Sequence, residues 1–172
     1  QERELCFTLL SQCEDRYEEA FARTYLADAL SSMGLLDSAI QECKKALDIT
    51  LRNNYEELSL TLYNLIGIIY TYTDDEQGAL DYYFKGIKLA TRMNDNMMCG
   101  ALFANIAFLY RKFQAYDKAI ETLRMAYDIV QKASENKMRV AFNDYVYSRE
   151  LAGIELQRGQ PDRAMEFLQQ ID

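Results

Sequence analysis

Apolar and small side chains recur along this chain in a register that predicts pairs of antiparallel helices. The same arrangement of positions is found in three segments, at 26–47, 66–87 and 106–127. One alanine marks the register in each segment, and successive alanines are 40 residues apart, at Ala39, Ala79 and Ala119. A fourth segment, 151–171, places Ala164 at the same position after 45 residues. Because each repeat of this length forms one supersecondary unit, we expect a helix, a short turn and a second antiparallel helix in every copy.

Two further small positions accompany each of these alanines. The first lies twelve residues earlier and comprises Ala27, Gly67, Ala107 and Ala152. The second lies seven residues later, at Ala46, Gly86 and Ala126. Small residues let two helix backbones approach closely, and a large side chain nine residues before the alanine fills the space between them, as at Leu30, Tyr70 and Tyr110. The fourth copy has Glu155 there, and we expect this glutamate to face solvent more, or to be covered by a segment beyond the C-terminus.

The composition agrees with long helices and narrows the range of functions. The 172 residues include one proline and seven glycines, fewer than the turns of an all-β protein usually need. The net charge of −8 argues against a nucleic-acid partner and against an anionic membrane surface. No apolar run reaches the length of about 18 residues that spans a bilayer, so we expect no membrane insertion. Histidine is absent, which excludes zinc sites of the Cys/His type and nucleophile–histidine catalysis.

The four cysteines form no C-x-x-C pair. Cys43 and Cys99 fall within apolar helical patterns, where a free cysteine packs as a small hydrophobe. We therefore expect buried free thiols, which favours a reducing, cytoplasmic location.

Asp74, Asp75 and Glu76 form an acidic cluster between two aromatic-rich segments. Clustered carboxylates can hold a metal or take part in acid–base catalysis. The repeat register, however, places these acids at a turn and at the start of a second helix, where carboxylates favour the positive end of the helix dipole. We therefore interpret them as a helix start and expect no metal, no cofactor and no catalytic residue in this chain.

The recurring positions resemble those of the tetratricopeptide repeat (TPR) over roughly residues 20–172. That family has a small residue at its eighth place, a large one at its eleventh, alanine at its twentieth and a small residue at its twenty-seventh. The resemblance implies an all-α, TPR-like superhelix, a right-handed solenoid of antiparallel helix pairs. We expect a single solenoid over 1–172, divided into 1–16 (the second helix of a partial repeat), 17–54, 55–95, 96–136 and 137–172. The repeats exceed the simplest length of 34 residues because their joints are extended, and Asn and Asp there tolerate left-handed backbone.

The resemblance also implies a concave groove lined by the first helix of each repeat. The family's inward-facing places correspond here to Thr24, Tyr25, Asp28, Ser32, Thr61, Asn64, Ile68, Thr71, Tyr72, Asn105, Phe108, Arg111, Lys112 and Arg149. Asn64 and Asn105 carry both donors and an acceptor, so each can hold a peptide backbone irrespective of its sequence. Arg111, Lys112 and Arg149 form a cationic patch suited to an acidic ligand. A clamp for a C-terminal carboxylate is not expected, because Thr24 and Asp28 stand where that TPR type has lysine and asparagine.

The resulting hypothesis is a non-catalytic module that binds a peptide or protein segment. Its repeats resemble the N-terminal TPR regions that precede GGDEF diguanylate cyclase domains in bacterial signalling proteins. That resemblance implies a cytoplasmic regulatory or sensory segment that controls an output domain. Two alternatives remain open, a regulator of the peptide-pheromone receptor type and a structural adaptor or homodimerisation module.

Overall fold

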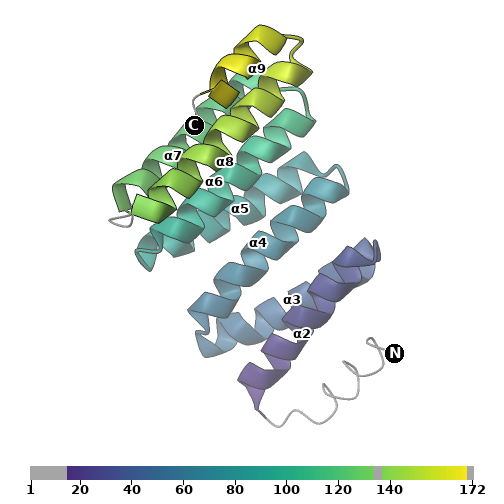
Figure 1. The fold of residues 1–172 in the computed structure, drawn as a ribbon. Helices are drawn as coiled ribbons and strands as arrows, with labels where there is room; N and C mark the ends of the chain where they lie inside the picture. Colours follow the sequence, from purple (N-terminus) through teal and green to yellow (C-terminus); the bar gives the residue numbers. More distant parts are fainter. Residues whose placement is uncertain (1–14, 134–136, 170–172) are drawn as a thin grey trace. The chain divides into compact units, whose positions relative to one another are not determined.

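The computed structural model describes residues 15–133 and 137–169, and within its last long helix it describes side chains from Asp144 onward. Cys6, Cys13 and the helix expected before residue 15 lie outside the described residues. The helices are α2 (Arg16–Ser32), α3 (Leu36–Asn53), α4 (Glu56–Tyr72), α5 (Glu76–Arg92), α6 (Asn96–Lys112), α7 (Tyr116–Ala133), α8 (Lys137–Gln157) and α9 (Pro161–Leu168) (Figure 1). No strand occurs in the described part of the chain, so the all-α prediction is confirmed.

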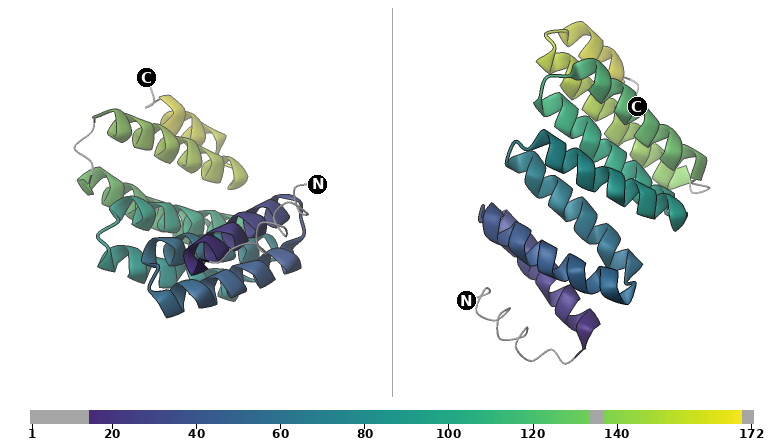
Figure 2. Two further views of the ribbon diagram at one scale, coloured as in Figure 1. Left: turned by 90° about the horizontal axis from the view of Figure 1, so that it is seen from below. Right: turned by 180° about the vertical axis from the view of Figure 1, so that it is seen from behind.

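Two compact units make up the chain, Gln1–Leu89 and Ala90–Asp172, and their boundary falls within α5. Successive helices form the expected pairs, α2 with α3 and α4 with α5 in the N-terminal unit, and α6 with α7 and α8 with α9 in the C-terminal unit. The pairing of α6 with α7 can be followed in Figure 2. None of the described helices combines the length and the apolar character that crossing a membrane requires.

Aspartate side chains mark the starts of three helices. The Asp75 carboxylate accepts a hydrogen bond of 2.8 Å from the Gly78 backbone N–H at the start of α5. Asp15 and Asp95 cap α2 and α6 in the same way. Such a bond satisfies one of the backbone donors that a helix start leaves open. The interpretation of the acidic cluster as a turn and a helix start is therefore confirmed.

Every described turn places one residue in the left-handed region. Within the helix pairs these residues are Gly34, Asp74, Gln114 and Gly159, and between pairs they are Asn54 and Asn94. The two asparagines confirm the expectation for the joints. Gln114 has a φ of 60°. Among these six residues, glutamine tolerates the left-handed conformation least, because it has a Cβ and lacks the short amide or carboxylate of Asn and Asp.

Replacing Gln114 by glycine is therefore expected to stabilise the protein. Relief of the left-handed strain stabilises the folded state by about 1–2 kcal/mol. The greater freedom of glycine in the unfolded chain offsets part of this gain, so the net increase in stability is roughly 0.5–1 kcal/mol. Thermal unfolding followed by circular dichroism measures the difference. The reciprocal control, Gly34→Gln, should lower stability by a similar amount, and a destabilised Gln114→Gly variant would contradict the assignment of strain.

The predicted small positions lie in the contacts between helices. All of them are buried: Ala27, Ala39, Ala46, Gly67, Ala79, Gly86, Ala107, Ala119, Ala126, Ala152 and Ala164. Large apolar side chains pack around them, among them Leu62 and Ile66 in the N-terminal unit and Leu123 and Ile154 in the C-terminal unit. Each such side chain contributes about 1.5–3 kcal/mol by leaving water.

The contact between α4 and α5 differs from those in the other pairs. A tyrosine, Tyr83, is buried there with its ring against Gly67, so close that a Cβ on Gly67 would lie 2.5 Å from the ring. Its hydroxyl lies 3.0 Å from the hydroxyl of Thr71, which also donates to the Gly67 carbonyl. Burial raises the pKa of Tyr83 to about 12, although the bond to Thr71 opposes the increase. This packing corrects one groove assignment, because Thr71 is buried against α5 and cannot reach a ligand.

Glu155 is a second correction. Its side chain is 4% exposed, which contradicts the expected solvent-facing position and leaves the alternative, a position covered by another segment. The equivalent position is buried at Leu30 and half-buried at Tyr70 and Tyr110, and α9 packs on α8, so packing within the helix pair decides the burial of Glu155. A guanidinium nitrogen of Arg158 approaches one Glu155 carboxylate oxygen at 3.9 Å, and the other oxygen has no hydrogen-bond partner among the described residues.

The expectation of buried thiols is confirmed for Cys43 and Cys99, both of which are buried. Burial is the main cause that raises the pKa of Cys43 to about 12, and the nearby carboxylates of Asp28 and Glu42 add to it. At neutral pH this thiol is therefore protonated and behaves as a small apolar side chain.

Candidate functional site

A cavity between α2 and α4 brings together many of the residues predicted to line a groove. It has a volume of about 390 Å³ and lies within the N-terminal unit. Its lining consists of Phe21, Thr24, Tyr25, Asp28, Leu58, Thr61, Asn64, Leu65 and Ile68. We call these residues the α2–α4 groove. Six of them were predicted from the repeat register: Thr24, Tyr25, Asp28, Thr61, Asn64 and Ile68.

The α2–α4 groove has an apolar floor and an aromatic rim. Leu58 and Leu65 are buried, and so is Thr24, whose hydroxyl donates to the Ala20 carbonyl within α2. On the rim, the rings of Phe21 and Tyr25 are 43% and 61% exposed, with their centroids 4.6 Å apart. An exposed pair of adjacent rings offers a surface on which an apolar group or a cation can lie.

The basic side chains of α2 are already held by carboxylates. Arg23 pairs with Glu19 at 2.9 Å and with Glu42 at 2.7 Å, and Arg16 pairs with Glu19 at 2.7 Å. Burial alone would raise the pKa of Glu19, but the hydrogen bonds from Arg23 and Arg16 outweigh it and hold the pKa below its ordinary value. Because these cations are neutralised, Asp28 is the charged side chain that determines the electrostatic character of the groove lining.

The remaining predicted contacts lie elsewhere. Asn105, Phe108 and Arg111 line a second cavity, of about 300 Å³, between α6 and α8 in the C-terminal unit. Tyr72, 59% exposed, lies at the end of α4 and lines none of the cavities described here. Lys112, the last residue of α6, and Arg149 on α8 are exposed and do not line the second cavity. Nine of the predicted contacts thus line two cavities, six in the N-terminal unit and three in the C-terminal unit.

Glu150 neutralises part of the predicted cationic patch. Its carboxylate lies 3.1 Å from a guanidinium nitrogen of Arg111 and 3.0 Å from one of Arg149. The Arg111 guanidinium also lies 5.1 Å from the centre of the Phe108 ring. Two of the three predicted cations therefore share one carboxylate within the chain.

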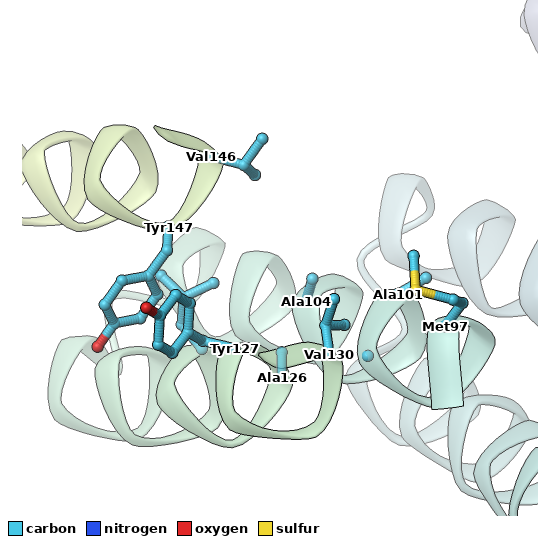
Figure 3. A pocket seen from close by; sticks show the side chains of 10 residues that line it. Met97, Ala101, Ala104, Ala126, Tyr127, Val130, Val146 and Tyr147 are labelled. Atoms are coloured by element: carbon cyan, nitrogen blue, oxygen red, sulfur yellow. The ribbon is translucent and has the colours of Figure 1, made fainter. Parts of the chain in front are cut away.

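A third cavity was not predicted. It has a volume of about 280 Å³ and lies among α6, α7 and α8 (Figure 3). Its lining is almost entirely apolar and consists of Met97, Gly100, Ala101, Ala104, Leu123, Ala126, Tyr127, Val130, Val146 and Tyr147. In Figure 3 the rings of Tyr127 and Tyr147 lie against each other, with centroids 4.4 Å apart. The run of small residues Gly100, Ala101 and Ala104 on α6 was the available signal, because it leaves space that larger side chains would fill.

Within residues 15–133 and 137–169, no three carboxylate, thiol or imidazole side chains are arranged to hold a metal ion. The acidic cluster at Asp74 serves the start of α5, as described above.

Comparisons with known proteins identify the class of fold. The family model described as "Tetratricopeptide repeat" matches residues 24–53, which cover the second half of α2 and all of α3. One segment of the chain therefore matches the tetratricopeptide repeat, in agreement with the resemblance that the recurring positions showed. No curated protein sequence matches the chain.

Solved structures extend this fold over nearly the whole chain. A signal transduction ATPase with a tetratricopeptide repeat sensor from Pyrococcus horikoshii is 21% identical, with a TM-score of 0.80 over 98% of this chain and 26% of that one. A Rap protein complexed with competence and sporulation factor is 18% identical, with a TM-score of 0.78 over 94% of this chain and 44% of that one. The TPR-like repeats of a putative kinesin light chain from Podosopora anserina are 18% identical, with a TM-score of 0.74 over 98% of this chain and 83% of that one. The chain spans less than half the length of the first two.

Proposed function

We propose that the protein binds an extended peptide or protein segment in the α2–α4 groove. The observation that carries the proposal is the convergence of six register-predicted residues on one cavity with an apolar floor, an aromatic rim and polar groups. Apolar surface supplies contact area, while a few polar groups fix the orientation of a ligand. The Rap protein of similar fold was solved with a bound factor, which supports a binding role for helical repeats of this kind.

Asn64 provides a direct test of the groove. Its side-chain amide can donate to and accept from a peptide backbone, so the Asn64→Ala variant should bind a groove ligand about tenfold more weakly. A phage-displayed library of random peptides, selected on the wild-type protein, supplies the probe, and calorimetry of an enriched synthetic peptide measures the affinity. The control is Asn105→Ala, which alters the α6–α8 cavity and should leave that affinity unchanged. An unaltered affinity in Asn64→Ala would place the binding site elsewhere.

We further propose that binding regulates an output domain of a larger cytoplasmic signalling protein, such as a diguanylate cyclase. The support for this role is the resemblance of the repeats to the N-terminal regions of those proteins. The test is to join the chain to the domain that follows it in its gene and to measure that domain's activity with and without the selected peptide. An activity that the peptide does not change would count against regulation and would favour the adaptor alternative.

The acidic ligand expected from Arg111, Lys112 and Arg149 gains no support from the geometry of α6 and α8, because Glu150 pairs with both arginines.

The homodimer alternative is tested by light scattering after size-exclusion chromatography. A monomer at high protein concentration would exclude it.

A further inference from the structure

One charged side chain lines the α2–α4 groove, and its chemistry indicates what kind of ligand the groove selects. Asp28 is exposed, and no described side chain forms an ion pair with it. Elsewhere in the N-terminal unit, the buried carboxylate of Glu42 pairs with both Arg23 and Lys45. The carboxylate of Asp28 therefore takes no part in the ion pairs that neutralise the neighbouring charges. It attracts a cation from outside the chain.

The helix on the opposite side of the groove reinforces this preference. The sequence of α4 contains Glu56 and Glu57 and no basic residue. On α2 the two arginines are engaged by Glu19 and Glu42. The chain as a whole carries a net charge of −8, so the long-range field also favours positively charged partners.

The aromatic rim lies on the same face of α2 as the carboxylate. Tyr25 precedes Asp28 by three residues and Phe21 precedes it by seven, a spacing that aligns side chains along one helix face. Both rings are exposed and adjacent, so their faces are accessible to a ligand. A guanidinium group stacks on such rings and pairs with a carboxylate through two parallel hydrogen bonds, which an ammonium group cannot do.

We propose that the α2–α4 groove recognises a basic segment, with an arginine side chain that stacks on Phe21 and Tyr25 and pairs with Asp28. This inference rests on the proposed function and specifies its ligand class. It differs from the acidic ligand that the sequence pattern predicted for the other end of the chain. The α6–α8 cavity has no such preference, because its arginine is paired internally with Glu150.

The test selects random peptides from a phage-displayed library on three proteins in parallel: the wild type, Asp28→Asn and the control Asp37→Asn. Asp37 is an exposed aspartate on α3 that does not line the groove. We expect arginine to be enriched among peptides selected on the wild type and on Asp37→Asn. The Asp28→Asn protein should still select peptides, but without the enrichment in arginine.

An enriched peptide then gives the affinities by calorimetry. Changing its arginine to citrulline, which keeps the shape and removes the charge, should weaken binding to the wild type about tenfold and leave binding to Asp28→Asn nearly unchanged. Raising the ionic strength from about 0.1 M to about 1 M should weaken the wild-type complex more than the Asp28→Asn complex.

The outcomes separate this inference from the proposed function. Peptides that bind through Asn64 but show no enrichment in arginine, or an enrichment in acidic residues, would overturn the basic-ligand inference and leave the groove proposal standing. Failure of the wild type to enrich any peptide would overturn both. Equal loss of affinity in Asp28→Asn and Asp37→Asn would show a general charge effect and would also overturn the assignment to Asp28.

Discussion

Replacing Gly67 by alanine is expected to lower the free energy of unfolding by about 1 kcal/mol. The added methyl group would lie 2.5 Å from the Tyr83 ring, which is buried and held at its hydroxyl by Thr71. Overpacking of this kind costs about 1–3 kcal/mol, and the better helix propensity of alanine returns only about 1 kcal/mol. The net effect is therefore opposite in sign to the one that helix propensity alone predicts. Denaturant unfolding followed by circular dichroism measures it.

A second substitution should rescue this variant. In the other pairs the equivalents of Gly67 and Tyr83 are Ala27 with Cys43 and Ala107 with Leu123, so an alanine is combined with a smaller partner. The double variant Gly67→Ala/Tyr83→Leu reproduces the combination of the third pair. It should be more stable than the sum of the two single effects predicts, by at least about 1 kcal/mol. Strict additivity would show that the ring does not limit the space at Gly67.

Replacing Arg23 by alanine is expected to destabilise the protein by roughly 2 kcal/mol. Breaking a fully buried ion pair costs about 3–5 kcal/mol because it leaves a buried charge without its partner. Here Glu42 is buried but retains Lys45, and the Arg23 side chain is itself 21% exposed, so the expected cost is smaller. The control Lys45→Ala removes the more exposed partner and should cost less.

The effect of Arg23→Ala should also depend on pH. Arg23 helps to hold the pKa of Glu19 below its ordinary value, so this ion pair stabilises the folded state above the unfolded pKa, near 4.5. The contribution is lost as the pH falls through the lower, folded pKa. The difference in stability between the wild type and the variant should accordingly shrink between neutral pH and about pH 3. A difference that is constant over this range would show that packing of the arginine stem, rather than its charge, causes the effect.

The repeat register predicted much of the fold because its signal depends on local spacing. Small residues that recur at one spacing, as Ala39, Ala79 and Ala119 do, indicate close contacts between helices, and the helices themselves follow from periodicity and turn residues. The acidic residues around Asp75 could be interpreted in the same way, since a helix start is a local feature. Six of the predicted groove residues also meet in one cavity, because inward-facing places repeat with the helices.

The corrections and omissions concern contacts between residues that are distant in sequence. Thr71 was predicted to face the groove, but its position is determined by the Tyr83 side chain on the next helix. For Glu155 the sequence left open a solvent-facing or a covered position, and the packing of α9 on α8 decides its burial. The pairing of Arg111 with Glu150 joins α6 and α8 and could not be deduced from composition.

The sequence by itself determined that this protein is a set of helix pairs joined through small residues, because helix periodicity and close backbone approach are properties of local spacing. Only the tertiary structure decided which charges remain available to a ligand. Arg16, Arg23 and Arg111 are all engaged by carboxylates, while Asp28 lies beside exposed rings in the α2–α4 groove. The physical reason is that the availability of a charge depends on the side chains that folding brings within a few ångströms of it, and linear spacing does not specify them.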